Sequence, residues 1–105
     1  MLKIYNYALL NFYPNGLAQI SPHKDDEKCL DLQSDIPTLS LGAVREMHFT
    51  RPHFAPIKVT LEHGSFVLIK PPTNQFWYHG IPVQSSVMKG RISVTFRNIT
   101  FPQEK

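Results

Sequence analysis

The sequence predicts an all-β domain built as a sandwich, a jelly roll or a barrel. Short runs of aliphatic and aromatic residues recur at intervals of roughly 8–12 residues, which is typical of such folds. Prolines and glycines separate these runs and supply turns between strands. With 105 residues, of which 42% are hydrophobic, the chain is expected to fold as one globular domain over residues 1–105.

The first half of the chain contains four expected strands, at residues 4–13, 17–21, 38–41 and 44–50. The first strand ends at Pro14-Asn15-Gly16, whose Asn-Gly pair is a strong turn signal. Gly42 is expected to bend the chain between the third strand and the fourth. Residues 23–35 are polar and acidic and predict an exposed loop, in which residues 27–33 are the only weak helical candidate.

The second half contains four more expected strands, at residues 57–62, 65–69, 76–79 and 91–99. The first of these alternates cleanly between apolar and polar residues, as a half-buried strand does. His63-Gly64 predicts the turn after it, and Pro71-Pro72 opens a loop before the short aromatic strand.

Composition excludes several classes of protein. A single cysteine, Cys29, leaves no internal disulfide and favours a reducing, intracellular compartment, either cytoplasm or nucleus. No apolar run approaches the roughly 20 residues that cross a bilayer, so no membrane span is expected, and the N-terminus does not resemble a signal peptide. The net charge of +3 is compatible with a polyanionic partner but does not require one.

Three side chains form a candidate metal site. His23 and Asp25 lie two positions apart after an expected strand, so both can point to one side. His79 follows the aromatic strand and supplies a candidate third ligand. Two histidines and one carboxylate make the facial triad of non-haem Fe(II) oxygenases. The alternative is that His-x-Asp occurs by chance and that another histidine is available; of the others, we expect His63 at the surface and His48 and His53 solvated.

Two arginines near the C-terminus strengthen this interpretation. Arg91 and Arg97 are six positions apart on one expected strand and therefore share a face. A guanidinium binds a carboxylate through two hydrogen bonds, and the co-substrate 2-oxoglutarate carries two carboxylates. The alternative is that one or both pair with Asp or Glu or lie on a solvated face. Asn11 and Tyr13 also share a face and offer further hydrogen bonds.

With these residues in place, the sequence resembles the AlkB family of Fe(II)/2-oxoglutarate dioxygenases. The matching stretches, in the family's order, are NFYPNG at 11–16, SPHKDDE at 21–27, PTLSLGA at 37–43, LEHGSFVLIKPP at 61–72, WYHGIP at 77–82 and RISVTFRNI at 91–99. The resemblance implies a double-stranded β-helix, a distorted jelly roll that holds the iron near one end. It also implies that His23, Asp25 and His79 are the iron ligands, with O2 as the second co-substrate.

The resemblance assigns further contacts by position. The residues that it implies for 2-oxoglutarate are Asn11, Tyr13 and Arg91 at the distal end, Arg97 nearer the iron, Ile20 and Thr38 as minor contributors, and Ser93 where many relatives have asparagine. Asp26 matches an acidic residue that relatives use to contact the exocyclic amine of a methylated base.

The activity that the resemblance implies is oxidative demethylation of 1-methyladenine or 3-methylcytosine in single-stranded DNA or RNA. Bases would stack on aromatic side chains and cations would hold phosphates; the candidates are Phe12, Trp77, Tyr78, Lys24, Lys28, Arg45 and Arg51. Only ten residues precede Asn11, so we expect a minimal catalytic core without the N-terminal lid of nucleic-acid repair members. Such a core would be a truncated piece, a naturally minimal enzyme, or an enzyme whose substrate needs no lid. The alternatives are a hydroxylase or demethylase of a protein or small molecule, and a non-catalytic β-sandwich binding module.

Overall fold

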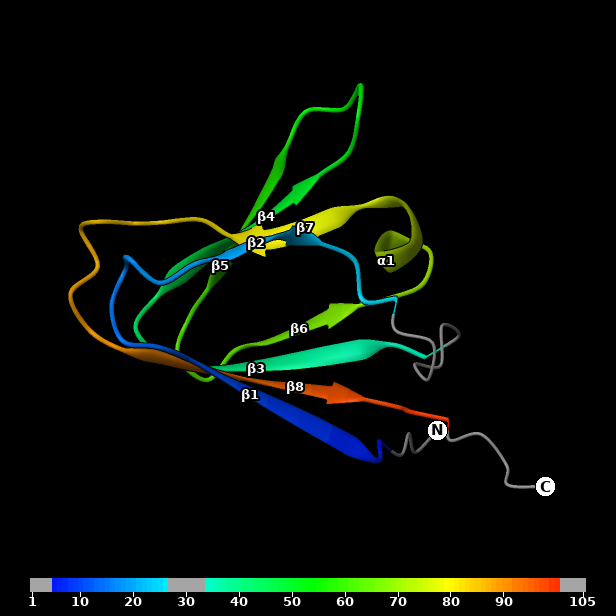
Figure 1. Ribbon diagram of the computed structural model, residues 1–105, viewed down its shortest axis with the longest axis horizontal. Coiled ribbons are helices and arrows are strands. Elements are labelled where there is room, and N and C mark those ends of the chain that lie inside the picture. Colours follow the sequence, from blue (N-terminus) through cyan, green and yellow to red (C-terminus); the bar gives the residue numbers. More distant parts are fainter. Residues whose placement is uncertain (1–4, 27–33, 101–105) are drawn as a thin grey trace.

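The computed structural model describes residues 5–26 and 34–100. Its elements, in chain order, are β1 (Tyr7–Tyr13), β2 (Ile20–His23), β3 (Ile36–Gly42), β4 (Arg45–Thr50), β5 (Ile57–Leu61), β6 (Phe66–Ile69), α1 (Thr73–Phe76), β7 (Tyr78–Ile81) and β8 (Arg91–Arg97). The strands form two four-stranded sheets, ordered β1-β8-β3-β6 and β2-β7-β4-β5, and all the pairs described are antiparallel. Figure 1 shows these sheets as two layers, with α1 at the ends of β6 and β7, which it connects. The expected all-β jelly-roll architecture is confirmed.

Strand alternation gives the first sheet two faces of different character. Inward positions of β8 carry two arginines, a serine and a threonine, all of them buried. Outward positions of this sheet are apolar, and Phe12 and Ile92 are direct partners on that side. The exposed members of this outer apolar face are Leu10 (64%), Phe12 (67%), Phe66 (59%), Leu68 (52%) and Ile92 (38%). The sheet therefore presents its polar side to the interior of the domain.

A small apolar core lies between the layers. It consists of Tyr13, Ile36, Met47, Phe49, Leu61, Ile69 and Ile81. These residues come from both sheets, so their burial holds the two layers together. The stabilising free energy is about 25 cal/mol for each Å² of apolar surface removed from water.

Several strand boundaries differ from those expected. The Asn15-Gly16 turn forms, with Leu17 N–H donating to Asn15 Oδ1 at 2.9 Å. However, the chain there passes from one sheet to the other, and the second strand begins at Ile20. Residues 76–79 do not form a single strand, because Phe76 ends the short helix α1 and β7 begins at Tyr78. Four helical residues are too few to show a helical period in the sequence.

Gly42 bends the chain with a φ of +98°, in the left-handed region that favours glycine. The helical candidate at 27–33 lies outside the described residues. Among the residues described, no helix has the length and apolar character needed to span a membrane.

Candidate metal and co-substrate site

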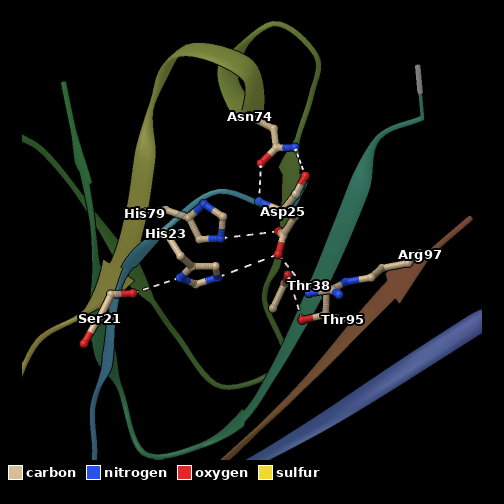
Figure 2. A network of polar contacts seen from close by, with 8 residues as sticks. All are labelled: Ser21, His23, Asp25, Thr38, Asn74, His79, Thr95 and Arg97. Atoms are coloured by element: carbon tan, nitrogen blue, oxygen red, sulfur yellow. Dashed lines mark hydrogen bonds and ion pairs between the residues drawn. The ribbon is translucent and has the colours of Figure 1, made fainter. Parts of the chain in front are cut away.

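Two histidines and one aspartate converge at the end of β2. His23 and His79 are directly opposite each other in the β2–β7 ladder, with ring centroids 4.4 Å apart. Asp25 follows β2 and lies against both rings (Figure 2). One ligand atom from each of the three residues lies within 4.8 Å of the others, so the group could hold a metal ion.

Hydrogen bonds orient these ligands. His23 Nδ1 lies 2.9 Å from the carbonyl oxygen of Ser21. Because a carbonyl only accepts, Nδ1 carries the proton in this contact, and Nε2 faces Asp25 Oδ1 at 3.7 Å. His79 Nε2 lies 3.5 Å from Asp25 Oδ2. A histidine ligand whose other nitrogen binds a backbone carbonyl is the usual arrangement at metal sites. The carbonyl of Ser21 was not predicted, because nothing in a sequence marks a backbone acceptor.

Asp25 is buried but stays charged. Its burial alone would raise the pKa of the carboxyl, but contact with His79 and the positive charge of Arg97 outweigh that effect, and the net pKa lies below the ordinary value. Arg97 Nη2 donates to Asp25 Oδ1 at 2.8 Å. A metal ion requires the ionised carboxylate, so this environment suits a ligand.

A cavity of about 270 Å³ opens beside this group, between the two sheets. Every residue expected to contact 2-oxoglutarate lines it: Asn11, Tyr13, Ile20, Thr38, Arg91, Ser93 and Arg97. Sequence reasoning missed Leu9, Met47, Ile69, Ile81 and Thr95, which also line the cavity. The spacing could have identified two of them. Thr95 shares a face of β8 with the two arginines, and Leu9 shares a face of β1 with Asn11. Nothing in the sequence marked Met47.

Arg91 places a buried cation in the wall of the cavity. The side chain is fully buried, and its Nη2 donates to Ser40 Oγ at 3.0 Å. Within the described part of the chain, its Nε and Nη1 have no hydrogen-bond partner and no carboxylate pairs with it. Burial lowers the pKa of Arg91, although the neighbouring Tyr13 opposes that shift. A buried cation with unused donors is costly, and a carboxylate ligand would satisfy it.

Arg97 differs from Arg91 in this respect. The alternative for the two arginines was a pair with an acidic residue. Arg97 fits this alternative, because it bonds to Asp25. The two side chains share a face as expected, and both line the cavity. Arg97 bonds to the metal group, whereas Arg91 lies farther along β8.

A second hollow, of about 560 Å³, adjoins the metal group. It is lined by Lys24, Asp25, Asp26, Pro71, Pro72, Asn74 and Gln75. Asp26 is exposed at this hollow and does not belong to the metal group. Lys24 lines both hollows and places its ammonium 4.6 Å from the centre of the exposed Tyr78 ring. Lys24 is therefore shared by the two hollows, whereas Tyr78 lines neither of them and lies beside the Lys24 ammonium.

Two of the expected stacking residues lie elsewhere. Phe12 is on the outer apolar face, on the side of the sheet opposite the cavity, so the fold does not bring it to the site. Trp77 lines neither hollow but packs against the core and meets Phe54 edge to face at 5.6 Å. Strand alternation explains the first case, because Asn11 and Tyr13 point inward and Phe12 between them points outward.

The cations expected to bind phosphates lie in different environments. Arg45 is 0% exposed, so its assignment to phosphates is wrong. Its guanidinium donates to the carbonyls of Asn15, Ala18 and Pro82 and to the side chain of Gln84. Burial lowers the pKa of Arg45, with Tyr13 opposing the shift. Arg51 lies over the rings of Phe54, Phe76 and Trp77. Lys28 is outside the described residues.

The other histidines take no part in the metal group. His53 is exposed, as expected. His63 is also at the surface, where its Nδ1 accepts a hydrogen bond from Gly42 N–H at 2.9 Å. His48 is half-buried and lies 3.5 Å from Glu46, so it is only partly solvated.

Comparisons with known proteins agree with this geometry. Residues 3–97 match the 2OG-Fe(II) oxygenase superfamily. The mouse protein named DNA oxidative demethylase ALKBH2 is 36% identical over 92% of this chain and 44% of its own length. Human alpha-ketoglutarate-dependent dioxygenase alkB homolog 3 is 30% identical over 90% of this chain and 37% of its own length. This chain thus spans less than half of either relative.

A solved structure shows the same fold. The structure of OsALKBH1 superposes with a TM-score of 0.72 and 21% identity, over 91% of this chain and 49% of that one. The fold, the matched superfamily and the named relatives agree with one another. The chain therefore belongs to the 2OG-Fe(II) oxygenase superfamily and, within it, to the AlkB family.

Proposed function

We propose that this chain carries the catalytic domain, over residues 1–105, of an Fe(II)/2-oxoglutarate-dependent dioxygenase. In this proposal His23, Asp25 and His79 bind the iron. The single observation that carries it is the meeting, in one cavity, of this group with the buried guanidinium of Arg91, whose Nε and Nη1 are unused within the described part of the chain. A metal site alone would not need that cation, and a carboxylate co-substrate would.

The remaining cavity residues would hold 2-oxoglutarate. Arg91 would bind its distal carboxylate, with Asn11 and Tyr13 beside it, because all three line the same cavity. Arg97 would keep Asp25 ionised and in place. When bound, Fe(II) with 2-oxoglutarate and O2 supplies the oxidising power for attack on a C–H bond. The protein's own part is to orient these groups and keep bulk water from the cavity.

For the substrate, we propose an N-methylated base, 1-methyladenine or 3-methylcytosine, in single-stranded DNA or RNA. Relatives that carry the name DNA oxidative demethylase support this class. The exposed carboxylate of Asp26 beside the second hollow could accept a hydrogen bond from a base amine, and Lys24 and Tyr78 offer a cation and a ring nearby. The proposal includes a reducing cytoplasmic or nuclear location, which the single cysteine supports.

The decisive experiment is mass spectrometry of a single-stranded oligonucleotide that carries 1-methyladenine or 3-methylcytosine. The protein is incubated with Fe(II), 2-oxoglutarate and O2, beside a His23→Ala control. We expect one methyl group to be lost, as formaldehyde, only with the intact metal group. Succinate formed without loss of the methyl group would retain the dioxygenase and redirect the search to a protein or small-molecule substrate. If neither product forms and Fe(II) does not bind, the alternative of a non-catalytic binding module remains.

A further inference from the structure

Asp25 lies where the β2–β7 ladder has already ended. The last pair of that ladder joins His23 to His79, and Asp25 comes two residues later, in a segment without strand structure. Its backbone N–H and C=O therefore have no partner in a neighbouring strand. Buried backbone groups need such partners, and a metal ligand needs a fixed position.

Asn74 supplies both missing hydrogen bonds from one side chain. Asp25 N–H donates to Asn74 Oδ1 at 3.0 Å, and Asn74 Nδ2 donates to Asp25 O at 2.7 Å (Figure 2). Because a backbone N–H only donates and a carbonyl only accepts, this pair also fixes which way the amide points. The carboxamide thus does for Asp25 what an adjacent strand would do.

The element that carries Asn74 leads directly to the opposing histidine. Asn74 lies in α1, whose turn is closed by hydrogen bonds from Phe76 N–H to Pro72 O at 3.1 Å and from Trp77 N–H to Thr73 O at 2.9 Å. The chain then enters β7, which contains His79. The two hydrogen bonds between Asn74 and Asp25, here called the clamp, therefore connect the segment of the carboxylate ligand to the segment of a histidine ligand. Asn74 and Asp25 are 49 positions apart in the sequence.

We propose that Asn74 is a positioning residue of the metal centre, and this rests on the proposed function for the identity of the metal group. It fixes the backbone of Asp25, so that the carboxylate faces both histidines before an ion arrives. Arg97 holds the same residue by its side chain. Without the clamp, the ion would have to order residues 24–26 as it bound, and affinity would fall.

Manganese(II) binding to the whole chain, followed by electron paramagnetic resonance, tests this role without turnover. Asn74→Ala removes both hydrogen bonds, and Asn74→Leu removes them with little change of volume. Loss of a residue that orients a metal ligand typically weakens affinity roughly ten- to a hundredfold, and we expect that range for both variants. Gln75→Ala, an exposed neighbour on the same helical turn, is the matched control and should bind as the wild type does. Equal melting temperatures of the metal-free proteins would show that the loss of affinity does not come from unfolding.

The outcomes separate this inference from the proposed function. Unchanged manganese affinity in the Asn74 variants, with binding abolished in His23→Ala, overturns the role of Asn74 and leaves the metal group standing. Unchanged affinity in His23→Ala overturns the metal group itself. If the Asn74 variants do not fold, hydrogen exchange of the wild-type, metal-free protein decides. We expect a protected Asp25 amide, and an amide that exchanges as fast as in an unstructured peptide overturns the clamp.

Discussion

Arg97 and Asp25 are 72 positions apart in the sequence, and Arg97 Nη2 donates a hydrogen bond of 2.8 Å to Asp25 Oδ1. The last strand of the domain thus holds the carboxylate that follows its second strand. Asn74 holds the backbone of the same aspartate from a third segment. Three distant parts of the chain meet at one residue, so the metal group depends on the complete tertiary fold.

Removing the guanidinium at this contact should destabilise the metal-free protein. Arg97→Met leaves Asp25 buried without its cation, and we expect a loss of about 3 kcal/mol in the free energy of unfolding. Urea unfolding measures it. In the double variant with Asp25→Asn no charge is left unpaired, so its loss should be smaller than the sum of the two single losses. Simple additivity would show that the two side chains are not coupled.

Arg91 should matter for the co-substrate and not for the metal. Arg91→Met removes a charged hydrogen-bond donor worth about 1.5–3 kcal/mol, so the Kd of 2-oxoglutarate should rise roughly tenfold to a hundredfold or slightly more. Calorimetric titration of the metal-free protein with manganese(II), and then of the manganese-loaded protein with 2-oxoglutarate, gives the two affinities. Arg51→Met, which removes a cation outside the cavity, serves as control. An unchanged 2-oxoglutarate affinity in Arg91→Met would remove the main support for the proposed co-substrate site.

The adjacent acids Asp25 and Asp26 should behave differently. Asp25→Ala is expected to abolish metal binding and turnover, because it removes a ligand. Asp26→Ala is expected to keep the metal and lower kcat/KM for a methylated oligonucleotide about tenfold, since it removes one hydrogen bond to the base. Manganese binding and methyl loss, measured side by side, separate the two roles. Loss of the metal in both variants would contradict this division.

Arg45 should be a stability residue. Its guanidinium joins the carbonyls of Asn15, Ala18 and Pro82, which belong to two different loops. Arg45→Met leaves these acceptors without a donor, and we expect a loss of about 3 kcal/mol, or a melting temperature lower by roughly 12–24 °C. Lys58→Met makes the same change of charge at an exposed position of the neighbouring strand and should melt as the wild type does.

Much of the fold and cavity could be predicted because β-strands alternate. The i, i+2 rule correctly placed Asn11 with Tyr13 and Arg91 with Arg97 on inward faces, and turn residues located the strands. The same rule, applied to Phe12, would have placed it on the opposite face. Alternation thus carries real information about which side chains line a cavity between two sheets.

Other features had no local signal. The burial of Arg45 depends on carbonyls of loops that only the complete fold brings around it. Asn74 is an ordinary polar residue of a proline-rich loop until its amide is seen against Asp25. The short helix α1 escaped because four residues are less than a period and a half of a helix. Residues that act through backbone atoms of distant segments cannot be read from spacing.

The outer apolar face has a practical consequence. Leu10 and Phe12 on one edge strand, and Phe66 and Leu68 on the other, are exposed on the outward side of one sheet. Exposed apolar surface of this kind promotes association. Copies of this domain in a test tube will therefore tend to gather through that side as concentration rises, well away from the cavity. Light scattering and sedimentation should accompany each binding or turnover experiment. They show whether the measured affinity or rate refers to single chains or to associated ones.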